Sequence, residues 1–266
     1  MKKNVNHTFA ICAYQESPYL EECIRSIMNQ HWLGDVIMTT STPSDFLHNL
    51  AKQYNIPLYI RNGQPNIKED WNYAYDCAKT QWVTVAHQDD VYSPDYVRSL
   101  MKALEKYKDA IAFTTDYRPY IGNRVVEGNA NCRIRHFLRS PLKSRILSGS
   151  TWWKKHILAL GNSICCPTVS YNKERLGEHF FTSELCYNID WDTFLKLGDI
   201  KGQFAYFDAP LVYYRISEEA TSSDFIKNHK RELDDVAMFQ KFWPDWIVRI
   251  LMKFYTKAYT IYNEGE

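Results

Sequence analysis

The segment at residues 87–96, H-Q-D-D-V-Y-S-P-D-Y, contains the residues best suited to chemistry. Asp89 and Asp90 follow an apolar run at residues 82–86 and precede a Ser-Pro pair that is typical of a helix start. Two adjacent carboxylates at the end of a strand can hold a hard divalent cation through oxygen ligands. Such a cation neutralises a diphosphate leaving group as negative charge develops on it. Alternatively, both residues only begin a turn and cap the next helix, and the segment alone leaves both interpretations open.

A second acidic segment, N-I-D-W-D, lies at residues 188–192 before the apolar residues of T-F-L-K-L. Asp190 or Asp192 at the start of a helix that faces a cleft could accept a proton from a hydroxyl group. General base catalysis of this kind contributes about 10²–10⁴-fold to a rate. The alternative is that these residues only begin the helix.

Several familiar phosphate-binding and hydrolytic motifs are absent from the sequence. The chain has no G-x-x-x-x-G-K-[ST], no G-x-G-x-x-G, no G-x-S-x-G and no H-E-x-x-H. It contains 10 Gly in 266 residues, which leaves little material for a glycine-rich phosphate loop. A phosphate site in this chain would therefore rely on a metal ion and basic side chains.

Strands and helices alternate over the first half of the chain. Apolar runs predict strands at residues 8–13, 35–40, 56–60, 82–86 and 110–115. Helix signals fall between them: Ser17-Pro18, the capping box Thr42-Pro43-Ser44-Asp45 with a helix to about Gln53, an apolar stripe at 67–78, and Ser93-Pro94. This alternation predicts an α/β doubly wound, mostly parallel sheet flanked by helices.

Ligands of such sheets bind at the carboxyl ends of the strands. Polar residues that follow the predicted strands are therefore candidate binding residues: Tyr14, Glu16, Arg61, Asn62, Asp89 and Asp90.

The composition is that of a globular protein, with 45% hydrophobic and 24% charged residues. A net charge of +1 gives no global field for nucleic acid. Aromatic residues make up 15% of the chain, which favours a Tyr-rich core and also suits stacking on sugars and bases. The seven Cys form no C-x-x-C pair, no apolar run reaches 18 residues and the N-terminal residues do not resemble a signal peptide. We therefore expect no structural zinc, no transmembrane segment and a cytoplasmic location.

The second half of the chain has two distinctive segments. Residues 128–173 contain eight Lys or Arg and no Asp or Glu, and could meet a phosphorylated acceptor, a diphosphate or an anionic membrane, or form a solvated surface. From about residue 225 the sequence is helical in pattern, with an apolar stripe of Trp243, Trp246, Ile247, Ile250, Leu251 and Phe254. Core packing is the favoured role of this stripe, and peripheral membrane contact is the alternative.

The order of these segments resembles the large family two of inverting glycosyltransferases. The carriers of the resemblance are A-I-C-A-Y-Q-E-S-P-Y-L-E-E-C-I-R-S-I-M-N-Q at 10–30, R-N-G at 61–63, W-N-Y-A-Y-D-C-A-K-T-Q-W-V-T-V-A-H-Q-D-D at 71–90, D-W-D at 190–192 and L-V-Y-Y-R-I-S at 211–217. The match spans about residues 7–222. It implies a GT-A fold, a nucleoside diphosphate sugar donor (UDP or dTDP favoured) and a glycan or lipid-linked acceptor, as in bacterial surface polysaccharide synthesis.

The resemblance also implies roles for individual residues. Ala13, Tyr14, Glu16 and Arg61 would border the nucleobase, and Asp70 the base and ribose. Asp89 would bind Mn²⁺ or Mg²⁺ with Gln88 beside it, while His87 and Asp90 are less certain ligands. Asp190 would be the general base, with Asp192 as the second choice, and Arg215 would approach the diphosphate.

The sequence departs from the family pattern at three places. His87 stands where the family has the first acid of D-x-D, and His suits Mn²⁺ better than Mg²⁺. The second strand ends in T-T-S-T at 39–42 where the family has an Asp, and Ser217 stands where the family has a closing His. We therefore expect metal dependence to be weak, with Mn²⁺ favoured.

The resulting interpretation is a GT-A domain at residues 1–222, with a nucleotide-binding half at 1–117 and an acceptor-side half at 118–222. A helical extension at 223–266 follows. Two rival interpretations remain: a nucleotidyltransferase on a related fold, which should have a glycine-rich basic loop after the first strand, and a degenerate protein that binds sugar nucleotides without turnover. The inner face of the membrane is an alternative to a free cytoplasmic location.

Overall fold

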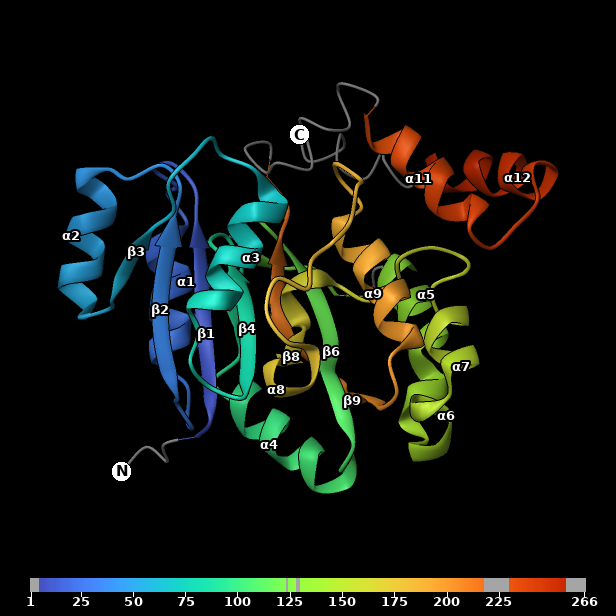
Figure 1. Ribbon diagram of the computed structural model, residues 1–266, viewed down its shortest axis with the longest axis horizontal. Helices are drawn as coiled ribbons and strands as arrows, with labels where there is room; N and C mark the ends of the chain where they lie inside the picture. The colour runs from blue at the N-terminus through green and yellow to red at the C-terminus, as the bar shows by residue number, and fades with distance from the viewer. Residues whose placement is uncertain (1–4, 123, 128–129, 218–229, 257–266) are drawn as a thin grey trace.

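Strand β1 (His7–Ala13) lies inside the central sheet and is buried along almost its whole length. The computed structural model describes residues 5–122, 124–127, 130–217 and 230–256. In it the strand order is β3-β2-β1-β4-β8-β6-β9-β5 (Figure 1). Successive side chains of a strand point to opposite faces, so Phe9 and Ile11 enter one core and Ala10 enters the other. This explains why β1 is an uninterrupted apolar run.

The five predicted strands are confirmed. They are β1, β2 (Asp35–Thr40), β3 (Leu58–Ile60), β4 (Trp82–His87) and β6 (Ala110–Ile121). The first four form one parallel set in the order β3-β2-β1-β4. Their carboxyl ends therefore meet at one edge of the sheet, where the candidate binding residues lie.

Four further strands were not predicted from the sequence: β5 (Val91–Tyr92), β7 (Arg124–Val125), β8 (Ser170–Asn172) and β9 (Gln203–Arg215). The short strand β8 lies antiparallel between β4 and β6, and β9 runs parallel to β6. The α/β class is confirmed, and the sheet is more mixed than the alternation in the first half indicates. Because β9 also pairs with β5, its last residues reach the segment that follows β4.

Helices cover both faces of the sheet. Helices α1 (Leu20–Met28), α2 (Asp45–Tyr54) and α4 (Tyr96–Lys106) bury apolar side chains in the core that contains Phe9. Helices α3 (Ile67–Cys77) and α9 (Ile189–Asp199) pack into the core that contains Ala10. The strands that end at the site are thus fixed by a packed core on each face of the sheet.

Three helices begin later than their sequence signals indicate. Helix α1 begins at Leu20, because the Ser17 hydroxyl accepts from the Tyr19 N–H in a local turn. The N-cap of α2 is Ser44 and not Thr42, whose hydroxyl is occupied by the Gln15 N–H at 2.7 Å. Helix α4 likewise begins after Ser93-Pro94. In each case the hydroxyl that was expected to cap the helix accepts a hydrogen bond from another backbone N–H.

The acid-free stretch forms a run of short helices beside the sheet. These are α5 (Ala130–Arg139), the 3₁₀ turn η1 (Ser140–Lys143), α6 (Arg145–Gly149) and α7 (Thr151–His156). A second 3₁₀ turn, η2 (Cys166–Thr168), leads into β8, and α8 (Lys173–Leu176) follows it.

Helices α11 (Lys230–Gln240) and α12 (Asp245–Tyr255) lie in the part of the chain predicted to be a helical extension, and both bury side chains in the core that contains Ala10. The predicted apolar stripe is divided between two faces, which corrects the assignment of the whole stripe to the core. Its members Trp243 and Leu251 pack against the core that contains Ala10, whereas Trp246, Ile250 and Phe254 are exposed. Helix α12 lies at the right of Figure 1. The proposed boundary at residues 222 and 223 lies outside the described residues and stays a prediction. Within the described ranges, each helix is too short or too polar to cross a membrane.

We predict that Lys173 stabilises the helix that carries Asp70. Its ammonium donates to the carbonyls of Tyr75, Asp76 and Ala78 at 2.7–3.3 Å, at the end of α3 where carbonyls have no partner within the helix. Lys173→Met should lower the free energy of unfolding by about 2 kcal/mol in urea titrations. The exposed Lys102→Met on α4 is the matched control and should change little. Equal stability of the two variants would contradict this role.

Candidate active site

The ends of β1 and β4 are joined by the side chain of Gln88. The Tyr14 N–H donates to Gln88 Oε1 at 2.8 Å, and Gln88 Nε2 donates to the Tyr14 carbonyl at 3.0 Å. The side-chain amide therefore continues the pairing of the two strands beyond their last residues. Both polar atoms of Gln88 are used in this contact, which holds the exposed Tyr14 beside the segment that contains Asp89.

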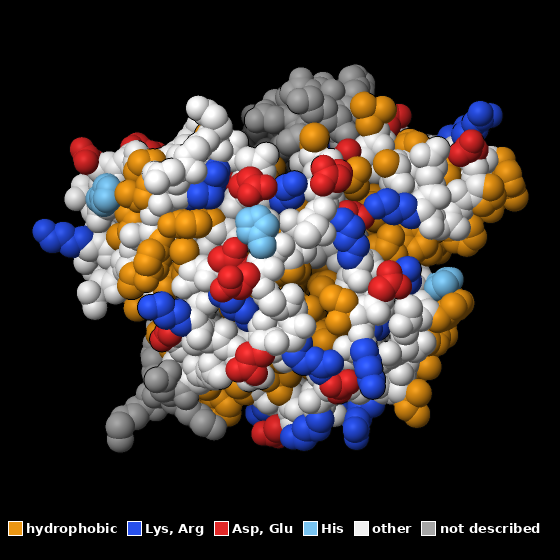
Figure 2. Space-filling view, in the orientation of Figure 1, with side chains coloured by type: hydrophobic (Ala, Val, Ile, Leu, Met, Phe, Trp, Pro, Cys, Tyr) orange, Lys and Arg blue, Asp and Glu red, His pale blue; other side chains and the backbone are white. Residues whose placement is uncertain are grey.

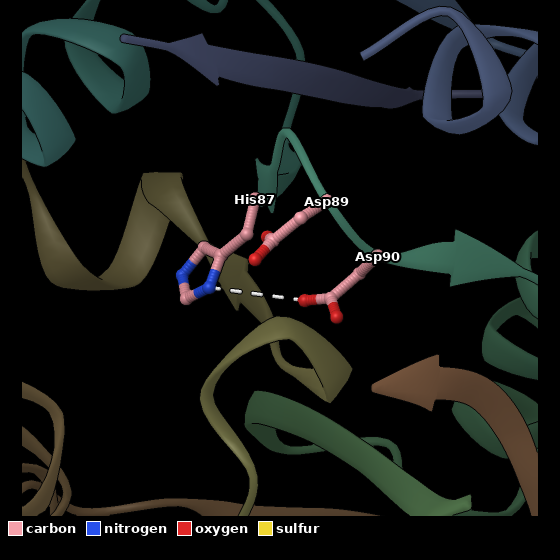
Figure 3. A group of neighbouring side chains, drawn as sticks. All are labelled: His87, Asp89 and Asp90. Carbon is pink, nitrogen blue, oxygen red and sulfur yellow. Dashed lines mark ion pairs between the residues drawn. The ribbon is translucent and has the colours of Figure 1, made fainter. Parts of the chain in front are cut away.

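His87, Asp89 and Asp90 bring one ligand atom each to a common point after β4. These three atoms lie within 4.8 Å of one another (Figure 3). His87 Nδ1 is 3.8 Å from Asp90 Oδ2, and the imidazole stacks on Trp71 of α3 with a ring separation of 5.3 Å. The sequence-predicted ligands are thus together, and Trp71 is a neighbour that sequence reasoning did not identify.

Burial sets the protonation of this cluster. Burial raises the pKa of Asp89, while burial and the charge of Asp89 raise that of Asp90. Burial lowers the pKa of His87 to about 4, so the imidazole is neutral near pH 7 and keeps a lone pair. His87 Nε2 and Asp90 Oδ2 are buried and find no hydrogen-bond partner among the described residues. A divalent cation fits this donor set, because it would pair with the carboxylates and accept the imidazole lone pair.

Arg215, the last residue of β9, contacts the acidic segment that contains Asp89 and Asp90. Its backbone N–H donates to Asp90 Oδ1 and its Nε donates to the Asp89 carbonyl, both at 2.9 Å. The guanidinium forms an ion pair with Glu22 and lies against the rings of Tyr19 and Tyr120, with its central carbon 4.2 and 4.5 Å from their centroids. Arg215 is 3% exposed, so these contacts position Asp89 and Asp90. Glu22, Tyr19 and Tyr120 carry no motif that could have identified them from the sequence.

Arg61 and Asp70 form a second polar group at the ends of β2 and β3. Arg61 Nε donates to Asp70 Oδ1 at 2.7 Å, and Asp70 Oδ2 accepts from the Ser41 hydroxyl and the Asn66 N–H, both at 3.1 Å. The Arg61 guanidinium also donates to the carbonyls of Asn62 and Gln64. The ion pair is mostly buried, and it fixes the loop between β3 and α3 beside the end of β2.

The remaining predicted nucleotide-binding residues follow β1. Ala13 is buried as the last residue of the strand, while Tyr14 is 43% exposed and Glu16 is exposed. Gln15 between them has φ 53°, a left-handed conformation that turns the chain away from the strand. The turn leaves Tyr14 and Glu16 accessible to a ligand at the edge of the sheet.

Asp190 and Asp192, both in the first turn of α9, have different surroundings. Asp192 is buried and forms ion pairs with Lys196 at 2.8 Å and with Lys241. Burial opposes its ionisation, but these lysines outweigh burial and lower its pKa. Asp190 is partly exposed and forms no ion pair with a lysine of the described residues; Asn162 Nδ2 donates to its Oδ2 at 2.7 Å. Burial raises the pKa of Asp190 to about 6.

The two acidic segments lie near one dipeptide, Cys165-Cys166. Burial first, and then the charges of Asp190 and Asp90, raise the pKa of the Cys166 thiol, so both carboxylates are close enough to act on it. The charge of Arg135 on α5 acts in turn on Asp190 and lowers its pKa, against the larger effect of burial. Arg135 and Asn162 are therefore neighbours of the candidate base that the sequence did not reveal individually.

Comparison with protein families gives a match over more than half of the chain. The model of the family described as Glycosyl transferase family 2 matches residues 8–164. This range includes β1 through α7 and the whole segment 87–90. In a search of curated proteins, no sequence matches.

Solved structures share the fold at low sequence identity. Staphylococcus TarS, as S. aureus TarS 1-349 in complex with UDP-GlcNAc, has a TM-score of 0.58 at 15% identity, over 84% of this chain and 61% of that one. Mannosyltransferase PcManGT from Pyrobaculum calidifontis, in complex with GDP-Man and Mn²⁺, has a TM-score of 0.57 at 13% identity, over 90% and 64%. Glucosyl-3-phosphoglycerate synthase from Mycobacterium tuberculosis, with Mn²⁺ and UDP-Glc, has 0.53 at 14%, over 90% and 80%. The chain thus spans less than two thirds of the TarS chain.

We predict that Arg215 is far more important for stability than an exposed arginine with a similar partner. Arg215→Met would leave Glu22 and the carboxylates of Asp89 and Asp90 without their buried cation, at a cost of about 3–5 kcal/mol in the free energy of unfolding. Arg25→Met is the matched control, because Arg25 also forms an ion pair on α1, with Glu21 four residues earlier, but is exposed. Urea titration of both variants measures the difference. Similar midpoints for the two would contradict the positioning role of Arg215.

Proposed function

This chain belongs to glycosyl transferase family 2, and on that premise we propose that it moves a sugar from a nucleoside diphosphate sugar to a hydroxyl group, with inversion at the anomeric carbon. Its fold is that of GT-A nucleotide-sugar transferases. The observation that carries the proposal is the contrast between the two acids of α9, since Asp190 alone is accessible and has a pKa near 6. A base with such a pKa is ionised at neutral pH and can still hold a proton.

On the donor side, His87, Asp89 and Asp90 would hold the cation. Asp89 is the principal ligand in this proposal, because Asp90 already accepts from the Arg215 N–H and His87 supplies a nitrogen. The bound cation would stabilise the charge of the departing diphosphate. Mn²⁺ is favoured over Mg²⁺, since an imidazole ligand suits Mn²⁺ better.

The nucleotide would lie along the ends of β1, β2 and β3. Tyr14 and Glu16 are exposed there, and the pair of Arg61 and Asp70 closes the far side of the same edge. Ala13 at the end of β1 and Gln88 after β4 support this edge of the sheet. TarS and the Mycobacterium tuberculosis synthase have solved complexes with UDP sugars and PcManGT with GDP-Man, which supports a nucleoside diphosphate in this position, with UDP or dTDP favoured.

On the acceptor side, Asp190 would take the proton of the attacking hydroxyl. The hydroxyl oxygen forms a bond to the anomeric carbon from the face opposite the diphosphate, and the carbon–oxygen bond to the diphosphate breaks with its electron pair leaving on the phosphate oxygen. The hydrogen bond from Asn162 orients the Asp190 carboxylate without supplying a compensating charge. Asp192 is excluded from this role in the proposal because two lysines occupy it.

The acceptor we propose is a glycan or a lipid-linked glycan of a bacterial surface polysaccharide, met on the cytoplasmic side of the membrane. The acid-free stretch at residues 128–173 supports an acceptor that carries negative charge, because its residue Arg135 acts electrostatically on Asp190. Basic side chains next to the base would attract such an acceptor.

We predict that one nucleotide binds in a manner that depends on Asp89 and Mn²⁺. Calorimetric titration of UDP, GDP, dTDP and CDP should give micromolar binding of one of them with Mn²⁺. Asp89→Ala should weaken this binding at least about tenfold, since a carboxylate ligand is lost. Asp45→Ala, on the exposed first turn of α2, is the control and should bind like the parent protein. Binding of none of the four would contradict the donor site, and binding without any transfer to acceptors would favour the non-catalytic alternative.

We predict that Asp190 and Asp192 fail in different ways. Asp190→Asn should lower kcat by about 10²–10⁴-fold with unchanged nucleotide affinity, because only the base is removed. Asp192→Asn should mainly lower stability, because Lys196 and Lys241 lose a buried partner. In the parent protein kcat/KM should fall as the pH drops through about 6, where Asp190 becomes protonated. Loss of turnover in a stable Asp192→Asn, with an active Asp190→Asn, would reverse the assignment.

A further inference from the structure

Two rows of large apolar side chains are exposed on the second half of the chain. On α12, Trp246, Ile250 and Phe254 follow one another at intervals of four residues and are 65%, 48% and 69% exposed. On α7 and the turn after it, Trp152 and Leu160 are 55% and 51% exposed. His156 lies between them in the sequence and stacks on Trp152 with a ring separation of 3.8 Å. We call these two rows together the apolar edge.

The two rows are neighbours in the fold. The Trp243 indole, just before α12, donates to the Ala159 carbonyl at 2.7 Å. Gly161 has φ +131° and lies so close to Tyr255 that a Cβ there would be 2.8 Å from the ring. The turn that carries Leu160 is thus fixed against residues on both sides of the α12 row. Figure 2 shows hydrophobic side chains along the right-hand edge, over α12 and, below it, over α6 and α7.

Folding does not account for the exposed row on α12. The buried residues Val248 and Met252 already pack this helix on the core that contains Trp191 and Phe239. Trp246, Ile250 and Phe254 point away from that core and keep large apolar surface in contact with water. Clustered apolar surface of this kind, rimmed by polar groups, is typical of an interaction site.

Basic side chains border the apolar row of α12, and the acids Glu232 and Asp245 line the same groove as two of them, Arg249 and Lys253. Arg249 and Lys253 are exposed on α12, at positions that alternate with the apolar row. The α7 row lies in the 46-residue stretch that has no Asp or Glu, with Arg145 exposed on the preceding helix. Asp245 is the acid of α12, and it accepts a hydrogen bond from Gln240 at 3.1 Å at the start of the helix. Apolar side chains interleaved with Lys and Arg are the pattern of a helix that lies in a membrane interface.

We propose that the apolar edge binds the surface of a membrane that contains anionic phospholipids. Anionic headgroups complement the exposed Arg249 and Lys253, and the indoles and aliphatic side chains can enter the interface between headgroups and acyl chains. A second copy of the chain fits less well. A symmetric contact of the edge with itself would place the same basic side chains against one another.

The position of the edge connects it to the candidate base. The Leu158 carbonyl accepts from the Trp191 indole at 3.2 Å, and Asn162 donates to Asp190. The same short segment therefore carries Leu160 at the edge and Asn162 at the base. This step rests on the proposed function: a lipid-linked acceptor held at the bilayer surface would reach Asp190 from the apolar edge.

Vesicle flotation tests the proposal on the full chain without any sugar donor. Vesicles of phosphatidylglycerol and phosphatidylcholine should bind the protein, and pure phosphatidylcholine should bind it much less. The triple variant Trp246→Gln, Ile250→Gln, Phe254→Gln should lower the partition coefficient at least about tenfold, because the apolar contacts are lost. The double variant Arg249→Gln, Lys253→Gln should lower it by about fivefold for each charge removed, and the loss should diminish at high salt.

Two controls match these variants. Ile60→Gln removes an exposed apolar side chain from β3, and Lys52→Gln with Lys102→Gln removes two exposed charges from α2 and α4; both should bind vesicles like the parent protein. Circular dichroism shows whether the triple variant is folded, and the double charge variant keeps the test valid if it is not. Absence of parent binding to anionic vesicles would overturn the proposal. So would self-association in sedimentation velocity that the triple variant abolishes without any vesicle binding. Neither result depends on turnover, so the proposed function stands or falls separately.

Discussion

The contact of Arg215 with the acidic segment after β4 is the interaction on which the site depends. Asp90 is fully buried beside Asp89, and two adjacent carboxylates in such surroundings are strongly destabilised when ionised. Among the described residues, Arg215 supplies the cation there, from the end of a strand 125 residues away, and Glu22 and two tyrosine rings hold its guanidinium. The last residues of β9 pair with β6 on one side and with β5, the strand that directly follows Asp90, on the other, and this double pairing places Arg215 beside Asp89 and Asp90. A bound divalent cation would neutralise the carboxylate charge that the Arg215 guanidinium leaves uncompensated.

The same balance between burial and compensation distinguishes the two acids of α9. Asp192 is the more deeply buried, yet its pKa is lowered because Lys196 and Lys241 surround it. Asp190 receives hydrogen bonds from Asn162 and the Trp191 N–H and is affected by the charge of Arg135, but burial outweighs these effects and raises its pKa to about 6. Lys241 belongs to the segment just after α11, so this C-terminal part of the chain takes part in neutralising Asp192. The proposed base, Asp190, lies two residues away and has no ion pair with Lys241 among the described contacts.

The sequence predicts the parts of this structure that have a local cause. Strands β1, β2 and β4 are buried apolar runs, and the residues that follow β1 and β4, such as Tyr14 and Gln88, meet because parallel strands end at one edge. Strand β8 has only three residues, too few to give a recognisable alternation, so its neighbours β4 and β6 define it. The periodicity of α12 identifies a helix, but the division between Val248 and Trp246 depends on where the distant Trp191 and Phe239 lie. Likewise, the partners of Arg215 come from three separate elements, and no spacing in the chain reveals them.

His87 gives the site a different charge balance from that of the family pattern. An acid at this position would add a third carboxylate to a buried cluster that has Arg215 as its cation, and each ionised group would raise the pKa of the others. Burial keeps the imidazole neutral instead, with its pKa near 4, so the cluster carries less negative charge before any cation binds. The protein therefore needs a cation less for its own stability, and in the proposed site a cation would meet a nitrogen ligand. Both consequences favour a looser dependence on metal and a preference for Mn²⁺ over Mg²⁺.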